Sequence, residues 1–387
     1  MEPPAGYTKA SPGQVCHLKR SLYGLKQASR QWNTELCSKL LAFGLTQSPH
    51  DHCLFYKHTT DSFLGLLIYV DDVLVTGSHS SDIKALKAYL HQLFTIKDLG
   101  QAKYFLGLEI ARGSDGTHLN QRKYILDILQ DTGLLLCKPA ALPFPQGLKL
   151  ESKGRSPLAE PDQYRRLVGR LLYLNLTRAD ITYCVQQLIQ FMNDPYTSHW
   201  DAVVHLLRYL KGCPSKGLFF PATPSATVTA YCDADWASCM DTRRSISGYC
   251  IFWGGSLISW KSKKQPTVSK SSAEAEYKAL NTLVCELLWI SYLASDLQLP
   301  ISTPIPLWCD NQAALHIVAN PVFHERTKHL DIDCHVVRNQ FKAGFVSPLK
   351  ISSQLQVADL FTKSLGKVQF GVLVSKLGMK DVHLCPT

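Results

Sequence analysis

The chain has 387 residues, of which 45% are hydrophobic, so it can bury sizeable cores, and its length predicts two or three domains. No apolar run is long enough to span a membrane, and the first residues form neither a basic nor an apolar leader segment. We therefore expect an intracellular protein, with the compartment open between cytoplasm and nucleus. The net charge of +10 favours a polyanionic partner. The 13 cysteines include no Cys-x-x-Cys pair, which argues against a zinc knuckle or a disulfide framework.

Residues 21–43 carry an apolar stripe with helical spacing that ends at Gly44. Three polar side chains, Lys26, Gln27 and Arg30, lie near the start of this predicted helix. Considered alone, they are the solvent-facing side chains of an amphipathic helix.

Residues 63–76 form an apolar, β-branched run with two adjacent carboxylates, Asp71 and Asp72, near its centre. Such a run predicts a buried strand, a two-residue turn and a second strand. Two carboxylates about 4 Å apart repel by roughly 4 kcal/mol at an effective dielectric constant of 20, so both stay charged only beside a cation. Mg²⁺ is the natural candidate for that cation. The alternative is a type I′ turn with both carboxylates in water.

The middle of the chain predicts a helix, a hairpin and a helical bundle. A helix begins at Ser80 or Ser81, and residues 104–112 and 118–121 predict a hairpin in which Gly107 allows a close backbone approach or a bulge. Residues 123–132 predict a short helix. Residues 139–161 contain five prolines, which predicts a linker or an extended strap. Residues 162–211 have helical spacing, and residues 212–224 predict a second break before the last domain.

The C-terminal part places carboxylates at the ends of predicted strands. Residues 227–235 alternate as a strand does, with Asp233 and Asp235 on one face. Residues 247–253 and 256–260 predict two further strands, which gives an antiparallel start to a sheet. Residues 306–310 predict a short strand ending at Asp310, where the carboxylate is either a site residue or a cap of the following helix.

A helix that begins near Ser272 carries two glutamates on different faces. Glu276 lies on the same stripe as four aliphatic residues and should point inward. A carboxylate on such a stripe is unfavourable unless it meets a cation or several donors, so Glu276 is a candidate site residue unless it lies at the rim and reaches water. Glu274 lies about 160° away around the helix and is predicted to pair with Lys278 on the surface.

The last segment carries a fourth carboxylate. Residues 345–351 predict a strand, and Ser353 with Gln356 forms a capping-box pattern that predicts a helix carrying Asp359. The simplest role of Asp359 is an ion pair with Lys363, four residues later.

Several of these segments resemble one family. Tyr69-Val70-Asp71-Asp72 resembles the polymerase motif of reverse transcriptases, and its flanks at residues 21–28, 97–100 and 104–110 resemble copia-type LTR retrotransposons. The order strand Asp, helix Glu, strand-end Asp and helix Asp resembles ribonuclease H. Matches to the copia branch continue at residues 232–236, 258–265, 271–277, 309–312, 326–332 and 357–363. The resemblance covers essentially the whole chain.

The resemblance implies an α+β protein with three domains. They are a partial reverse transcriptase palm over residues 1–118, a helical thumb or connection with a Pro-rich linker over residues 119–224, and an α/β ribonuclease H-like domain over residues 225–387. The last domain should contain a mixed five-stranded sheet with flanking helices. The hairpin at residues 104–121 is similar to the primer-gripping hairpin of the family, and the turn before the first helix should lie beside the incoming nucleotide and the template strand.

The resemblance also implies site residues, a cofactor and partners. Asp233, Glu276, Asp310 and Asp359 would hold two Mg²⁺ ions about 4 Å apart, with Mn²⁺ as an alternative ion and Asp235 as second choice for the first position. Asp71 and Asp72 would be metal ligands of the polymerase site. Residues expected to contact nucleic acid, each of which could equally be a solvated polar group, are Lys26, Gln27, Arg30, Lys261, Lys263, Lys264, Arg326, Lys328 and His329. The expected partners are an RNA–DNA hybrid and a primer–template duplex, with neither a membrane nor a small-molecule cofactor other than metal.

The polymerase site of the family needs a third aspartate before the first helix, and residues 1–20 contain none. We therefore expect hydrolysis of the RNA strand of RNA–DNA hybrids by the C-terminal domain, with polymerase activity lost through truncation. The alternatives are a non-catalytic nucleic-acid-binding remnant, and polymerisation that requires another polypeptide to provide the missing strand.

Overall fold

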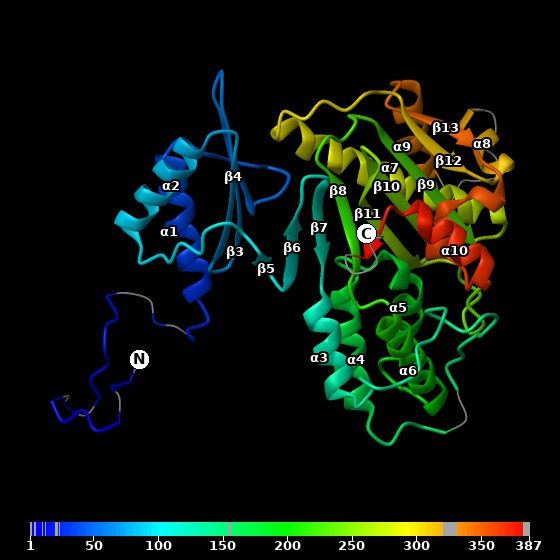
Figure 1. Ribbon diagram of the computed structural model, residues 1–387, viewed down its shortest axis with the longest axis horizontal. Helices are drawn as coiled ribbons and strands as arrows, with labels where there is room; N and C mark the ends of the chain where they lie inside the picture. Colours follow the sequence, from blue (N-terminus) through cyan, green and yellow to red (C-terminus); the bar gives the residue numbers. More distant parts are fainter. Residues whose placement is uncertain are drawn as a thin grey trace. The chain divides into compact units, whose positions relative to one another are not determined.

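The computed structural model describes the chain except for residues 1, 4, 10, 12, 20, 21, 23, 154, 155, 320–330 and 382–387, and except for the side chains of residues 331–334. The chain forms two compact units, Met1–Gln101 and Ala102–Thr387. Figure 1 shows the helices and strands of both. Within the described residues, no helix is long and apolar enough to cross a membrane.

The first unit is a four-stranded antiparallel sheet with two helices. Its strands, in the order β1-β2-β3-β4, are β1 (Thr46–Gln47), β2 (Leu54–His58), β3 (Phe63–Tyr69) and β4 (Asp72–Gly77). The helices are α1 (Ala28–Ala42) and α2 (Ser80–Leu93). Leu36 and Leu40 of α1 and Leu86 and Leu90 of α2 are buried in one core with the sheet. The predicted hairpin is confirmed, whereas the first helix begins at Ala28 and not at residue 21, because Gly24 has a φ of +89° that a helix does not accommodate.

The second unit contains the mixed five-stranded sheet that the resemblance implied, which confirms the expected fold class. Its strands are β9 (Val228–Asp235), β10 (Ile246–Trp253), β11 (Ser256–Lys264), β12 (Ile305–Cys309) and β13 (Val346–Lys350), in the order β11-β10-β9-β12-β13. β9, β10 and β11 are antiparallel, and β12 is parallel to both β9 and β13. The long helix α7 (Ser272–Asp296) packs against β9 and β10, as Figure 1 shows, and α8 (Gln312–Ala319) and α9 (Asp331–Lys342) complete this part.

The predicted helical bundle is present in the same unit. It consists of α3 (Arg122–Asp131), α4 (Pro161–Leu174), the short 3₁₀ helix η1 (Ala179–Ile181), α5 (Thr182–Ile189) and α6 (Thr197–Gly212). Their apolar faces meet in one core. A fully buried ion pair joins Arg178 to Asp180 at 2.8 Å, and the hydroxyl of Tyr209 donates to the same carboxylate at 2.6 Å. The described part of residues 134–160 contains neither a helix nor a strand, as the Pro-rich composition predicted.

A second sheet in this unit corrects two predictions. Its strands are β5 (Tyr104–Phe105), β6 (Leu108–Arg112), β7 (Gly116–Asn120), β8 (Lys216–Pro221) and β14 (Lys380–Asp381), in the order β14-β8-β7-β6-β5. The predicted break at residues 212–224 therefore contains a strand. Gly107 lies in the turn between β5 and β6, with a φ of +70°, and not inside a strand. The strand β7 hydrogen-bonds to β8, which follows it by almost 100 residues, so both strands belong to the unit that begins at Ala102.

The segment that carries Asp359 also differs from its prediction. Residues 353–361 form two short 3₁₀ helices, η4 (Ser353–Leu355) and η5 (Val357–Phe361), and α10 (Lys367–Lys376) follows. Gln356, between the two, is extended because its side chain bonds elsewhere: its amide nitrogen donates to Cys232 O at 2.9 Å, and its amide oxygen accepts from Ala358 N at 3.2 Å. These bonds tie η5 to β9 and stop a continuous helix.

Candidate metal centre

Asp233 lies near the end of β9, with 1% of its surface exposed. In the sheet register it faces Gly248 of β10. A Cβ atom at Gly248 would lie 2.7 Å from Phe361 Cβ, so the glycine is what lets the end of η5 pack onto the sheet beside Asp233. As a result, the Thr362 hydroxyl donates to Asp233 Oδ2, and the Lys363 ammonium lies 3.2 Å from Asp233 Oδ1.

Glu276 points into the protein from α7, with 4% of its surface exposed, which confirms the inward position that its apolar stripe predicted. The start of α7 is fixed by Gln265, whose amide nitrogen donates to Ser247 Oγ at 2.8 Å and to Ala275 O at 2.9 Å. The Cys309 thiol lies 3.8 Å from Glu276 Oε2. Burial, followed by the charge of Asp233, raises the pKa of Glu276 to about 11.

Glu274 is not on the surface, so that prediction was wrong. The residue is 5% exposed, and the expected partner Lys278 contacts its Oε1 at 2.9 Å in a buried pair. Glu274 Oε2 also accepts a hydrogen bond from Lys270 N at 2.8 Å. The segment before α7 folds back over this glutamate, since Lys278 also donates to Thr267 and Ser269. Helical spacing alone cannot predict that a segment outside the helix buries one of its side chains.

Two further carboxylates come from the end of β12 and from η5. Asp310 directly follows β12, and its Oδ2 accepts from the Ser353 hydroxyl at 2.7 Å. Asp359 is 7% exposed, and its Oδ1 lies 2.8 Å from the Lys363 ammonium, so the predicted pair is present. Burial and then Asp233 raise the pKa of Asp359 to about 7, although Lys363 opposes this effect. Burial lowers the pKa of Lys363, but Asp233 and Asp359 outweigh burial and raise it above its ordinary range.

Among the described residues, the four carboxylates fall into two groups that share Asp310. Asp233, Asp310 and Asp359 each offer an oxygen, and these oxygens lie within 4.8 Å of one another. Glu276, Cys309 and Asp310 form the second group with the same spacing. Asp235, the second choice for the first position, belongs to neither group, and burial raises its pKa.

The donor set fits a hard divalent cation. Carboxylate oxygens are the ligands that Mg²⁺ and Mn²⁺ prefer. The four carboxylates and the ammonium of Lys363 would together carry a formal charge of −3 (four negative, one positive). Burial first, and the neighbouring negative charge second, raise the pKa values of Glu276 and Asp359. A divalent cation would neutralise most of this negative charge.

The predicted polymerase residues lie in the first unit. Asp71 and Asp72 are exposed at the tip of the β3–β4 hairpin, and neither belongs to a group of three potential ligands in the part of the chain that the structure describes. The Trp32 indole of α1 donates to Val70 O at 2.8 Å, which ties the helix to this turn. Three exposed residues near the start of α1 are Lys26, Gln27 and Arg30.

The predicted nucleic-acid contacts of the second unit are described in part. Lys261 and Lys263 are exposed on β11, two strands from Asp233, whereas Lys264 is half-buried and lies 3.8 Å from the Cys239 sulfur. Arg326, Lys328 and His329 lie outside the described residues. Sequence reasoning missed Gly248 and Thr362 as supports of the site, because each acts at Asp233 from a different segment of the chain.

Comparison with known proteins agrees with the sequence motifs. Residues 1–146 match the family of reverse transcriptases (RNA-dependent DNA polymerases). Over 381 residues the chain is 41% identical to the retrovirus-related Pol polyprotein from transposon RE2 of Arabidopsis thaliana, a match that covers 98% of this chain and 26% of the polyprotein. An uncharacterized mitochondrial protein of Arabidopsis thaliana is 44% identical over 227 residues, which are 58% of this chain and 94% of that protein.

A solved structure, ribonuclease H1 from the halophilic archaeon Halobacterium salinarum NRC-1, covers 35% of this chain and 94% of its own, at 17% identity and a TM-score of 0.25. The family match places this protein in the class of reverse transcriptase-containing Pol proteins. More narrowly, the chain belongs to the copia-type retrotransposon Pol family, and it spans 26% of the length of the RE2 polyprotein.

Proposed function

We propose that the second unit hydrolyses the RNA strand of RNA–DNA hybrids in a reaction that requires Mg²⁺. The observation that carries this proposal is the convergence of Asp233, Asp310 and Asp359, with Glu276 joined to them through Asp310. Burying so many carboxylates together is unfavourable unless cations compensate their charge. When bound, divalent cations supply the charge that activates water and stabilises the leaving oxygen of a phosphodiester.

The protein's own residues hold and orient this set. Asp233 accepts from Thr362 and Asp310 accepts from Ser353, so a hydrogen bond restrains the orientation of each carboxylate. Glu276 closes the site from the α7 side. Because its pKa is raised to about 11, this group holds a proton at neutral pH and would have to release it to act as a charged ligand.

The nucleic acid would be held through its backbone. Lys261 and Lys263 are exposed cations two residues apart on β11, and Trp236, just after β9, is 48% exposed and offers a stacking surface. Contacts of this kind do not distinguish one base sequence of the nucleic acid from another. Selection of an RNA–DNA hybrid would rest on its shape and on its 2′-hydroxyl groups.

The test is cleavage of a labelled RNA strand in an RNA–DNA hybrid as the Mg²⁺ concentration is varied, with a DNA duplex of the same sequence as the control substrate. Asp233→Asn should abolish cleavage, whereas Asp235→Asn, which changes a carboxylate outside both groups, should retain most of it. Loss of cleavage in Asp235→Asn alone would move the first ligand to that residue. Binding of the hybrid without any cleavage would favour the non-catalytic alternative.

The hairpin of the first unit carries the residues that resemble a polymerase motif, but its geometry does not support polymerisation by this chain alone. We propose that this chain alone does not extend primers, because Asp71 and Asp72 are exposed and no third carboxylate joins them among the residues that the structure describes. Template-dependent extension that disappears in Asp71→Asn would contradict this proposal.

A further inference from the structure

The ammonium of Lys363 contacts two members of the carboxylate cluster. Its Nζ atom is 2.8 Å from Asp359 Oδ1 and 3.2 Å from Asp233 Oδ1, so it bridges two of the three carboxylates that form the first group. These partners are almost fully buried, with side-chain exposures of 9% and 1%, whereas the lysine side chain is 32% exposed. The cation therefore reaches a buried site from its solvent side.

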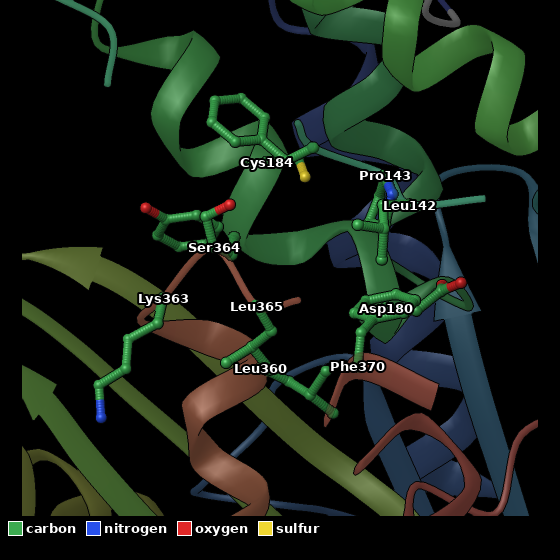
Figure 2. Close-up of a pocket in the computed structure, with 11 residues that line it drawn as sticks. Leu142, Pro143, Asp180, Cys184, Leu360, Lys363, Ser364, Leu365 and Phe370 are labelled. Atoms are coloured by element: carbon green, nitrogen blue, oxygen red, sulfur yellow. The ribbon is translucent and has the colours of Figure 1, made fainter. Parts of the chain in front are cut away.

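Hydrogen bonds fix the backbone at Lys363 and its neighbour Ser364. Lys363 N donates to Asp359 O at 3.0 Å, and the neighbouring Ser364 hydroxyl donates to Pro145 O at 3.1 Å. Ser364 and Lys363 line a cavity of about 20 Å³. Figure 2 shows the extended side chain of Lys363 pointing away from Cys184 and the rest of this cavity, with the nitrogen at its far end. The fold thus directs the ammonium to the carboxylates and not into the cavity.

An ammonium and a divalent cation cannot both bridge the same two oxygens. We propose that Lys363 is the resident counterion of this cluster, that it holds Asp233 and Asp359 together when metal is absent, and that a divalent cation displaces it. This inference rests on the metal site of the proposed function. The partly exposed lysine can leave without a change in the backbone, because four methylene groups separate its ammonium from the main chain. Displacement opposes metal binding, so Lys363 sets the metal concentration that the site needs.

The first test measures Mn²⁺ binding to the metal-free full chain by the electron paramagnetic resonance signal of free Mn²⁺. Lys363→Met keeps the length of the side chain and removes the charge, so its half-saturating Mn²⁺ concentration should fall by roughly tenfold, the effect of about one partly screened charge pair. Lys367→Met removes an exposed lysine at the start of α10 and should bind Mn²⁺ as the wild type does. Without metal, Lys363→Met should melt at a lower temperature than the wild type, and saturating Mn²⁺ should remove the difference.

The second test separates displacement from a simple effect of charge, and it needs no variant. The wild-type chain is treated briefly with an amine-acylating reagent, with and without Mn²⁺, and the modified lysines are identified by mass spectrometry. Mn²⁺ should increase the labelling of Lys363 and leave that of Lys367 unchanged. Tighter binding by Lys363→Met with no change in the labelling of wild-type Lys363 would overturn displacement.

The outcomes also distinguish this inference from the proposed function. If Asp233→Asn binds Mn²⁺ as the wild type does, the metal site itself is wrong and the inference fails with it. If binding depends on Asp233 but Lys363→Met is unchanged, the metal site stands and the role of Lys363 is refuted.

Discussion

Replacing Glu276 by glutamine should stabilise the metal-free protein at neutral pH. The residue is 4% exposed, and burial together with Asp233 raises its pKa from the ordinary 4.5 to about 11. The folded chain therefore keeps this glutamate protonated at pH 7, while the unfolded chain ionises it. Glutamine has nearly the shape of the protonated acid but cannot ionise in either state, so the variant lacks this difference between the two states.

The size of the effect follows from proton linkage. A group whose pKa is higher in the folded state favours unfolding as pH rises from its unfolded value to its folded one. Between pH 4.5 and pH 7 the accumulated loss is about 3 kcal/mol, at about 1.36 kcal/mol for each pH unit. At pH 5 it is only about 0.7 kcal/mol. The advantage of Glu276→Gln in the free energy of unfolding should therefore grow by about 2–3 kcal/mol from pH 5 to pH 7.

Urea unfolding in the presence of EDTA measures this difference. Six of the seven tryptophans belong to the second unit, so their fluorescence reports on the unit that contains Glu276. Mg²⁺ should stabilise the wild type more than the variant, because the variant lacks one ligand charge. An advantage that is equal at pH 5 and pH 7, or a loss of stability at pH 7, would refute the assignment of Glu276 as a buried, protonated carboxylate.

Two further substitutions test the surroundings of the site. Glu274→Gln removes the negative charge from the pair with Lys278 and should lower the free energy of unfolding by about 1–3 kcal/mol. The affinity for Mn²⁺ should not change. A weaker affinity for Mn²⁺ would place Glu274 in the metal site. Lys261→Ala combined with Lys263→Ala should weaken hybrid binding and reduce the slope of log K against log salt by about 0.9 for each phosphate that these lysines neutralise in the wild type. An unchanged slope would show that these exposed lysines do not bind the nucleic-acid backbone.

The two glutamates of α7 show what the sequence could predict about the site. Glu276 lies on a regular apolar stripe, so helical periodicity alone predicted that it points inward, and the structure confirms it. Glu274 lies off that stripe, but it is buried because the segment from Gln265 to Ser271 folds over it. Periodicity describes one helix. It does not show which other segment of the chain packs over a given face of that helix.

The same limit explains the error at residues 212–224. Gly212, Gly217 and Pro221 gave this stretch the composition of a break, yet residues 216–221 form strand β8. A Cβ atom at Gly217 would lie 2.1 Å from Leu119 O, so this glycine is what close approach to β7 requires. A glycine that permits strand pairing and a glycine that interrupts a strand look alike in a sequence, because the difference lies in a partner almost 100 residues away.

The four predicted carboxylates differ in how firmly the fold holds them. Asp233, Glu276 and Asp310 lie on or directly after strands and a helix whose backbone hydrogen bonds fix their positions. Asp359 lies on a 3₁₀ helix, and a hydrogen bond from the Gln356 side chain to Cys232 O holds that helix to the sheet. Order in the sequence could place the first three on regular elements, but it could not show that the fourth depends on a buried amide and on the space left by Gly248. Because Asp359 has the weakest backbone support, it gains most from the bridge that Lys363 makes to Asp233, which gives a structural reason for a lysine at this position in the carboxylate cluster.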